Sequence, residues 1–304
     1  MYRNNNSIFY VVLAHLFFST QDMVIKIISD DYALHQIILI RSLVAIFFIT
    51  FILTKFDGGI KCLYTKKIEL HLLRGLGITI ANVCIYCAFV TIPIGETMAL
   101  FFVAPLMITS MSYFIFKQKV NLINWIAVFL GMAGVLLIIK PGFHDFNYEY
   151  SLPIFAAISY TFVQLITFKI GKTEKASALA FYIQLVLIIM SLIIGLLIGD
   201  GKFGNPEEPT QDFLFRSWII PDFYDGLVII GSGILSGLGM FFIAHAYRNE
   251  LSSIVAPFEY VAVFFGVFWS IIIFQNWPDY ITWFGIFMIV LAGVMNFKKT
   301  NHLK

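Results

Sequence analysis

Charged residues are scarce in this sequence. Asp, Glu, Lys and Arg make up 12% of the 304 residues and hydrophobic residues make up 60%, whereas about a quarter of the residues of a soluble domain are charged. The mean hydropathy is +0.87. A composition this apolar excludes an ordinary soluble domain and predicts an all-α polytopic membrane protein. The net charge of +2 says little about partners, because the side of the membrane on which each charge lies matters more.

Motifs of catalysis and of metal binding are also missing. The chain has three cysteines, so no disulfide framework is indicated. Cys84 and Cys87 form a lone CxxC pair inside an apolar run, without the second pair of a zinc site. The sequence holds no Walker A motif, no HExxH motif and no basic nucleic-acid patch. We therefore expect a protein that is not an enzyme and that has no cofactor, no metal and no nucleic-acid partner.

Long apolar runs are what the sequence has in abundance. Each run is about 19 to 24 residues long, enough to cross about 30 Å of hydrocarbon as a helix. Backbone polar groups inside a bilayer must be satisfied within the segment, so helices are expected. The first run is not followed by a small-residue cleavage site, which predicts a retained helix. The ten runs are 7–28, 33–54, 71–91, 95–116, 121–139, 151–170, 176–199, 226–247, 252–274 and 279–297.

The Lys and Arg residues predict the orientation. With the N-terminus inside, about 15 of them, Arg74 included, fall in cytoplasmic segments. The outer loops hold only Lys140, Lys202 and Arg216. This asymmetry predicts cytoplasmic termini in a bacterial inner (plasma) membrane.

Residues 200–225 form the only long non-apolar insertion, which is acidic and holds several aromatic residues. An ordered outer cap is one interpretation. A variable surface loop with aromatic side chains at the membrane interface is the other, and the composition favours it.

The chain also contains a repeated pattern. Phe116 and Trp125 recur as Phe274 and Trp283, each 158 residues later. The tripeptide at 133–135, Ala-Gly-Val, recurs at 292–294. We expect a first repeat at residues 1–141 and a second at 142–304, each of five helices. Because five is odd, the repeats would have inverted topology, as in many secondary transporters. A chance match between apolar segments is the alternative.

Several short motifs lie within these runs. They are Asp22-Met-Val-Ile-Lys26, Ile40-Arg41-Ser42, Leu73-Arg74-Gly75, Ala104-Pro105 and Ala256-Pro257-Phe258-Glu259-Tyr260. With the two repeats, they resemble the drug/metabolite transporter superfamily, specifically its EamA-type proteins, over nearly the whole chain. Within that group the motifs look like those of S-adenosylmethionine uptake transporters, and riboflavin importers share much of the pattern. Those relatives usually have a basic residue at the position of Glu259. The resemblance implies a transporter that does not hydrolyse ATP.

Charges inside the predicted helices are costly and are candidates for function. Asp22 and Lys26 have i,i+4 spacing, so they form either an intrahelical ion pair or a coupling site. Arg41 is about 12 Å into its helix and needs an anionic partner, which Glu259 could supply across a central cavity. The pair could fix helix packing or open for a substrate anion. Glu96 lies at the outer mouth, where a helix N-terminus alone can explain it.

Polar and aromatic residues at mid-depth complete the predicted site. They are Asn82, Tyr86, Gln184, Tyr260 and Trp269, and they could bind a small molecule or simply satisfy one another between helices. Pro105 and Pro257 are candidate hinges. Together these features predict a carrier that moves a small polar metabolite by alternating access, with an S-adenosylmethionine-like compound as the leading substrate. Riboflavin import and amino-acid export are alternatives, and a structural membrane subunit is the alternative outside transport.

Overall fold

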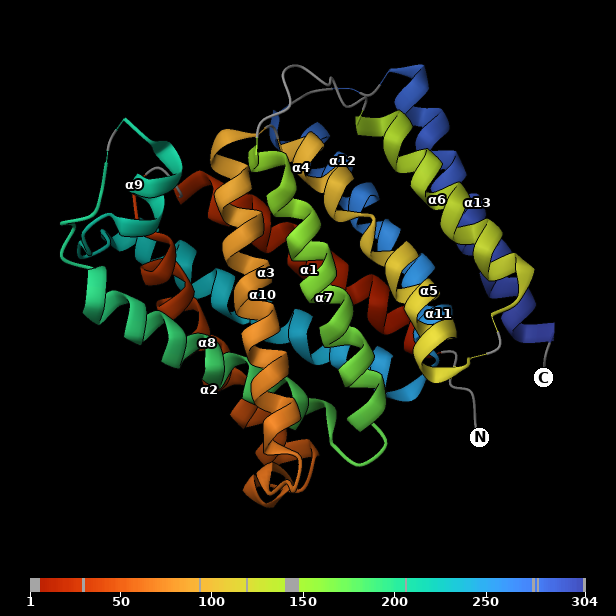
Figure 1. Ribbon diagram of the computed structural model, residues 1–304, viewed down its shortest axis with the longest axis horizontal. Coiled ribbons are helices and arrows are strands. Elements are labelled where there is room, and N and C mark those ends of the chain that lie inside the picture. The colour runs from red at the N-terminus through yellow and green to blue at the C-terminus, as the bar shows by residue number, and fades with distance from the viewer. Residues whose placement is uncertain are drawn as a thin grey trace.

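The computed structural model describes residues 6–28, 31–92, 94–118, 120–139, 148–205, 207–274, 277 and 279–302, and every regular element in these ranges is helical (Figure 1). The long helices are α1 (Asn6–Ile28), α2 (Leu34–Phe56), α3 (Ile68–Thr91), α7 (Ser151–Ile170), α8 (Ala176–Ile198), α10 (Phe223–Asn249) and α13 (Tyr280–His302). The shorter ones are α4 (Ile94–Phe101), α5 (Ala104–Phe116), α6 (Leu122–Ile139), α9 (Pro209–Phe215), α11 (Ser252–Val255) and α12 (Val261–Phe274), with the 3-10 turns η1 (Ile60–Leu63), η2 (Tyr148–Tyr150) and η3 (Ala256–Tyr260). The prediction of an all-α chain is confirmed.

Seven segments of the described chain are long and apolar enough to cross a membrane. They are 7–25, 34–56, 68–91, 151–170, 176–198, 223–249 and 252–269. Shorter apolar helices cover 104–116, 122–138 and 280–295. The predicted class, a polytopic helical membrane protein, is therefore confirmed.

Two of the predicted runs are not single helices. The run at 95–116 is divided, because α4 ends at Phe101 and α5 begins at Ala104. Pro105 lies in the first turn of α5, where its missing N–H costs no hydrogen bond. The run at 252–274 contains the η3 turn around Pro257. The expectation of one continuous helix is wrong at 95–116, where Pro105 begins a new helix. At the other place the segment 252–269 is still long and apolar enough to cross a membrane, with a 3-10 turn at Pro257.

Small residues let the long helices approach closely. The main helix pairs are α1 with α10, α3 with α7, α2 with α8 and α10, and α6 with α13. A Cβ atom at Gly134 of α6 would lie 2.7 Å from the carbonyl oxygen of Gly285 of α13. Close packing of this kind replaces the hydrophobic driving force that helices lack in lipid.

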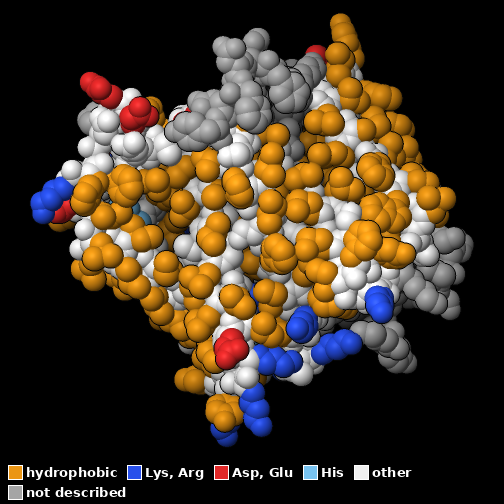
Figure 2. Space-filling view, in the orientation of Figure 1, with side chains coloured by type: hydrophobic (Ala, Val, Ile, Leu, Met, Phe, Trp, Pro, Cys, Tyr) orange, Lys and Arg blue, Asp and Glu red, His pale blue; other side chains and the backbone are white. Residues whose placement is uncertain are grey.

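The outer surface is apolar between two polar ends. Figure 2 shows apolar side chains over the middle of one face, with most of the Lys and Arg side chains at its lower end. Phe47, Phe114 and Leu196 are among the large side chains left exposed, at 80%, 74% and 83%. Such a surface suits contact with lipid rather than with water.

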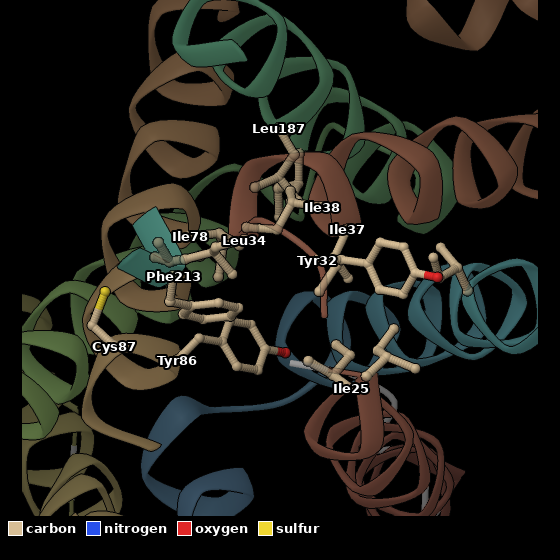
Figure 3. Close-up of a cluster of buried hydrophobic side chains, with 14 residues drawn as sticks. Ile25, Tyr32, Leu34, Ile37, Ile38, Ile78, Tyr86, Cys87, Leu187 and Phe213 are labelled. Atoms are coloured by element: carbon tan, nitrogen blue, oxygen red, sulfur yellow. The ribbon is translucent and has the colours of Figure 1, made fainter. Parts of the chain in front are cut away.

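Residues 200–225 are an ordered cap and not the favoured surface loop. Phe213 of α9 is 2% exposed and belongs to the apolar cluster that also contains Leu34, Ile78 and Tyr86 (Figure 3). The backbone N–H of Ile219 donates to the Gln36 side chain at 3.3 Å. Phe213 holds α9 against α2 and α3, whereas Phe203, Trp218 and Phe223 of the same segment are exposed.

Candidate functional site

A cavity of about 480 Å³ lies among the helices. Its size falls within the range of small-molecule sites, about 300 to 1,000 Å³. Most of its wall is apolar and includes aromatic and methionine side chains. The polar residues of the wall are His15, Ser19, Gln21, Asp22, Arg41, Asn82, Tyr86, Tyr160, Ser236 and Trp269. The cavity can therefore enclose a largely apolar body and offer a few polar contacts.

The two charged residues on this wall are joined by one phenol. The Tyr86 hydroxyl donates to Asp22 Oδ1 at 3.0 Å and accepts from Arg41 Nη1 at 3.1 Å. Gln21 Nε2 also donates to the Tyr86 hydroxyl, at 3.2 Å. Residues from α1, α2 and α3 thus form one network, which we call the Tyr86 cluster (Gln21, Asp22, Arg41 and Tyr86). It gives the cavity an anionic and a cationic group side by side.

Two donors on the cavity wall have no partner within the described residues. They are Arg41 Nε and Trp269 Nε1, both buried. Arg41 is 2% exposed and lies about 10 Å from the start of α2, so it cannot reach the aqueous phase. Buried donors are almost always satisfied in a native structure. These two N–H groups are therefore available to a bound molecule.

A second carboxyl lies behind the cavity wall. Glu259 of η3 is 2% exposed and accepts from the Tyr160 hydroxyl at 3.1 Å and from the Tyr247 hydroxyl. We call these three residues the Glu259 cluster. Tyr160 also lines the cavity, so a single phenol separates Glu259 from the enclosed space.

The structure brings some of the expected site residues together and separates others. Arg41, Asn82, Tyr86, Trp269 and Asp22 all line the cavity. The expected approach of Arg41 to Glu259 is not seen, because each is hydrogen-bonded to tyrosines of its own cluster. The partner of Arg41 is found on α3 instead.

Two other expected residues are buried beside the cavity rather than on its wall. Gln184 is fully buried and donates to the Ser236 hydroxyl at 3.2 Å. Tyr260 is fully buried, its ring lying 5.9 Å from that of Phe102. The side chains of Lys26 and Glu96, and so the expected Asp22–Lys26 pair, lie outside the described residues.

Sequence reasoning missed Gln21, Tyr160 and Tyr247. Gln21 could have been noticed as the neighbour of Asp22. Tyr160 and Tyr247 had no such signal, because the chain has 14 tyrosines and nothing local separates these two from the rest.

A third polar cluster lies where the α2–α3 and α7–α8 links meet. The sequence predicts a cytoplasmic position for Arg74, but Arg74 is 1% exposed inside α3. Its Nε donates to Thr167 at 2.8 Å and its Nη1 donates to the Leu179 carbonyl at 3.0 Å. Nearby, Glu174 accepts from Thr65 at 3.0 Å. We call Arg74, Thr167, Leu179, Glu174 and Thr65 the Arg74 cluster. It connects α3 to α7 and α8 at one end of the molecule.

Comparison with known proteins finds similarity to one family and to named transporters. Residues 5–140 match the EamA-like transporter family. The chain is 26% identical over 231 residues to the riboflavin transporter of Vibrio cholerae, a match covering 76% of this chain and 72% of that protein. It is 23% identical over 234 residues to the S-adenosylmethionine uptake transporter of Rickettsia prowazekii, covering 77% and 73% of the two chains.

A solved structure has the same fold. The chain superposes on a crystal structure with a TM-score of 0.79 over 99% of each chain, at 13% sequence identity. At this identity the likeness extends to the fold alone. The predicted resemblance to EamA-type proteins is confirmed by the family match at residues 5–140 and by the two relatives.

Proposed function

We propose that this membrane transporter moves a small polar metabolite by alternating access, with the cavity as its substrate site. The Tyr86 cluster is the observation that carries the proposal. It holds a carboxylate, a guanidinium and a phenol in a largely apolar cavity. Buried charges in membrane proteins are costly, and they mark substrate and ion pathways.

The packing pattern supports two inverted repeats, residues 1–141 and 142–304. Exchanging α1 with α7, α2 with α8 and α3 with α10 turns the α1–α10 contact into the α7–α3 contact, and both pairs pack extensively. The same exchange, with α6 exchanged for α13, leaves the α2–α8 contact and the α6–α13 contact unchanged. Gly75 of α3 packs on Val186 of α8, as Gly233 of α10 packs on Val44 of α2. These paired contacts favour a repeat over a chance match between apolar segments.

The distribution of basic residues supports a cytoplasmic position for both termini of the chain. The α2–α3 and α7–α8 links lie on the lower side in Figure 1, where α1 begins and α13 ends. Most of the visible Lys and Arg side chains gather on that side in Figure 2. The positive-inside rule assigns this side to the cytoplasm of a bacterial inner membrane.

In this orientation the cavity faces outward. Asp22, Arg41 and Tyr86 lie in the outer halves of α1, α2 and α3. At the cytoplasmic end the Arg74 cluster joins α3 to α7 and α8. The proposed cycle opens that end and closes the outer one.

An S-adenosylmethionine-like compound fits the chemistry of the wall best. An amino-acid group presents a carboxylate to Arg41 and an ammonium to Asp22, which are charge-assisted contacts. A heteroaromatic ring can stack on Trp269 or the neighbouring phenylalanines. Riboflavin, the substrate in the name of the Vibrio relative, has a heteroaromatic ring but no amino-acid group. An exported amino acid would contact only Arg41 and Asp22 and would leave the aromatic part of the cavity unused.

Counterflow in proteoliposomes tests the proposal. Vesicles that contain the purified protein are loaded with one unlabelled compound of a panel. Uptake of the same compound in labelled form, S-adenosylmethionine, riboflavin or an amino acid, is then measured. We expect one compound to exchange, and Arg41→Ala to abolish the exchange while still inserting as a monodisperse protein. Arg41→Lys keeps the charge but loses the fork of donors, and we expect partial activity. A structural subunit would exchange nothing, and a normally active Arg41→Ala would remove Arg41 from the substrate site.

A further inference from the structure

Glu259 is a buried carboxyl with an unusual set of neighbours. Its hydrogen-bond donors are two phenols, Tyr160 and Tyr247, and within the described part of the chain it forms no ion pair with Lys or Arg. By contrast, the carboxyl of Asp22 shares its phenol partner with a guanidinium. The two carboxyls thus differ in kind, and Glu259 is the one whose charge is not balanced by a fixed cation.

Among the described residues, no acid or base other than two phenols is hydrogen-bonded to Glu259. The buried or half-buried titratable and charged groups described on the elements around η3 are Tyr10, His15 and Asp22 of α1, Tyr160 of α7, Asp225, His245, Tyr247 and Arg248 of α10, and Tyr260 of η3 itself; Tyr113 of α5 and Tyr280 of α13 are exposed. Among these, only Tyr160 and Tyr247 are hydrogen-bonded to the carboxyl. The described parts of α6, α11 and α12 contain no titratable side chain.

Glu259 lies at a helix break and contacts two long helices. It lies on the 3-10 turn that interrupts the apolar segment 252–269. Its two phenol donors come from α7 and α10, so the carboxyl links three elements. Tyr160 reaches the cavity, where its ring lies 5.5 Å from that of Phe101. A change of charge at Glu259 therefore alters contacts at a helix break and at the cavity wall together.

We propose that Glu259 is a proton-binding site that couples substrate movement to a proton gradient, with the Tyr160 hydroxyl as the connection to the cavity. The inference rests on the proposed transport function. A hydronium ion in the cavity gives a proton to the Tyr160 oxygen as the phenol passes its own proton to Glu259. The net step converts hydronium and carboxylate into water and carboxylic acid, and Tyr160 is unchanged. Release on the other side reverses the step.

Two measurements on one preparation separate coupling from transport. Counterflow of labelled S-adenosylmethionine, or of riboflavin if that is the compound that exchanges, needs no net proton movement. Accumulation driven by an imposed pH difference does. For one proton per molecule, a gradient of about one pH unit supports about tenfold accumulation. We expect the wild type to accumulate the compound under one direction of the gradient and a lumenal pH dye to report proton flux.

Glu259→Gln keeps the shape of the side chain and its hydrogen-bonding capacity but fixes it neutral. We expect it to retain counterflow and to lose gradient-driven accumulation completely. Tyr160→Phe keeps the carboxyl and removes the hydroxyl that connects it to the cavity. We expect the initial rate of gradient-driven uptake to fall by about 100-fold, and counterflow to fall by less. Glu69→Gln, at an exposed position of the first turn of α3, is the matched control and should behave as wild type.

The outcomes are distinguishable. A wild type that exchanges the compound but ignores the pH gradient overturns the proton site and leaves the proposed function standing. A Glu259→Gln variant that accumulates the compound as the wild type does also overturns it. A wild type that exchanges no compound contradicts the proposed function itself, and the proton site falls with it.

Discussion

Tyr86 is the residue on which the candidate substrate site depends most. Its oxygen accepts from Arg41 and Gln21 and its hydrogen is given to Asp22. Without this phenol, a buried guanidinium and a buried carboxyl each lose a partner. Leaving a buried polar group unsatisfied costs about 1 to 3 kcal/mol, and more for a charged one.

Tyr86→Phe should therefore impair transport without preventing insertion. A loss of about 1.4 kcal/mol at the substrate site lowers the rate by about tenfold, so we expect initial counterflow to fall by at least about that factor. Tyr182→Phe is the matched control, because the Tyr182 hydroxyl donates to the Leu63 carbonyl outside the cavity. Equal rates for Tyr86→Phe and wild type would show that the bridge has no role in binding.

Two facing glycines, Gly134 and Gly285, determine how closely α6 and α13 pack. A Cβ at Gly285 would lie 2.6 Å from the carbonyl oxygen of Gly134, so Gly285→Ala forces the two helices apart. Overpacking of this kind costs about 1 to 3 kcal/mol, and we expect a lower midpoint of thermal unfolding in detergent. Gly231→Ala has no atom within 4 Å of the new Cβ and should unfold at or above the wild-type temperature. Equal midpoints for the two variants would contradict the close α6–α13 contact.

Residue types were easier to predict than residue partners. The cost of burying a charge identified Asp22, Arg41 and Glu259 from the sequence alone. Their partners could not be identified, since Tyr160 is 99 residues from Glu259 and Tyr86 is 45 from Arg41. These residues become neighbours only in the folded chain, where α7 packs near η3 and α3 packs near α2. The pairing of Arg41 with Glu259 was predicted from charge alone, whereas Tyr160 and Tyr247 were missed because a phenol carries no charge to signal its role.

At the scale of elements, the cap is the part that sequence reasoning judged wrongly. Aromatic residues in a loop are typical both of a membrane interface and of a packed cap, and composition does not separate the two. What separates them is Phe213, which enters the same apolar cluster as Leu34 and Ile78. The cap thus contributes Phe213 to the apolar core.

Phe213→Ala should destabilise the protein far more than a substitution at another aromatic residue of the same segment. Removing a buried phenylalanine costs about 3 to 5 kcal/mol. Phe203, which is 60% exposed, is the matched control, and Phe203→Ala should leave the unfolding temperature nearly unchanged. Thermal unfolding of both variants in the same detergent is the measurement. Equal effects would contradict the buried position of Phe213.

Breaks in helices were predicted in part. Pro105 and Pro257 were candidate hinges from sequence, and each lies at an interruption, at the start of α5 and inside η3. The extent of each interruption was not foreseeable. A proline removes one hydrogen bond, but whether a kink or a separate helix results depends on neighbours far along the chain.

For the whole molecule, composition and hydropathy predicted the class because a bilayer tolerates few alternatives. The positions of apolar runs such as 33–54 and 176–199 agree with α2 and α8 to within two residues. The same reasoning placed Arg74 in a cytoplasmic segment, because a charge near a run's end looks like a loop residue. The tertiary contacts with Thr167 and Leu179 are what allow it to be buried.

The proposed sidedness predicts a labelling pattern. In cells, a membrane-impermeant maleimide should reach Lys202→Cys in the outer segment without permeabilisation. Cys62, in the α2–α3 link, should react only after permeabilisation. Cys84 and Cys87 are replaced by alanine in both proteins, and Cys62 is also replaced in the Lys202→Cys protein, so that each protein reports one position. Reaction of Cys62 in intact cells would reverse the orientation.

The central claim is that the outward-facing cavity is where the substrate binds, and substrate protection tests it most directly. Ser19 lines the cavity, and Ser19→Cys in a background without the native cysteines changes one atom of the wall. We expect maleimide to label it from outside and the compound found by counterflow to slow that labelling in a saturable way, with Lys202→Cys unaffected. A labelling rate at Ser19→Cys that is the same with and without the transported compound would contradict the account.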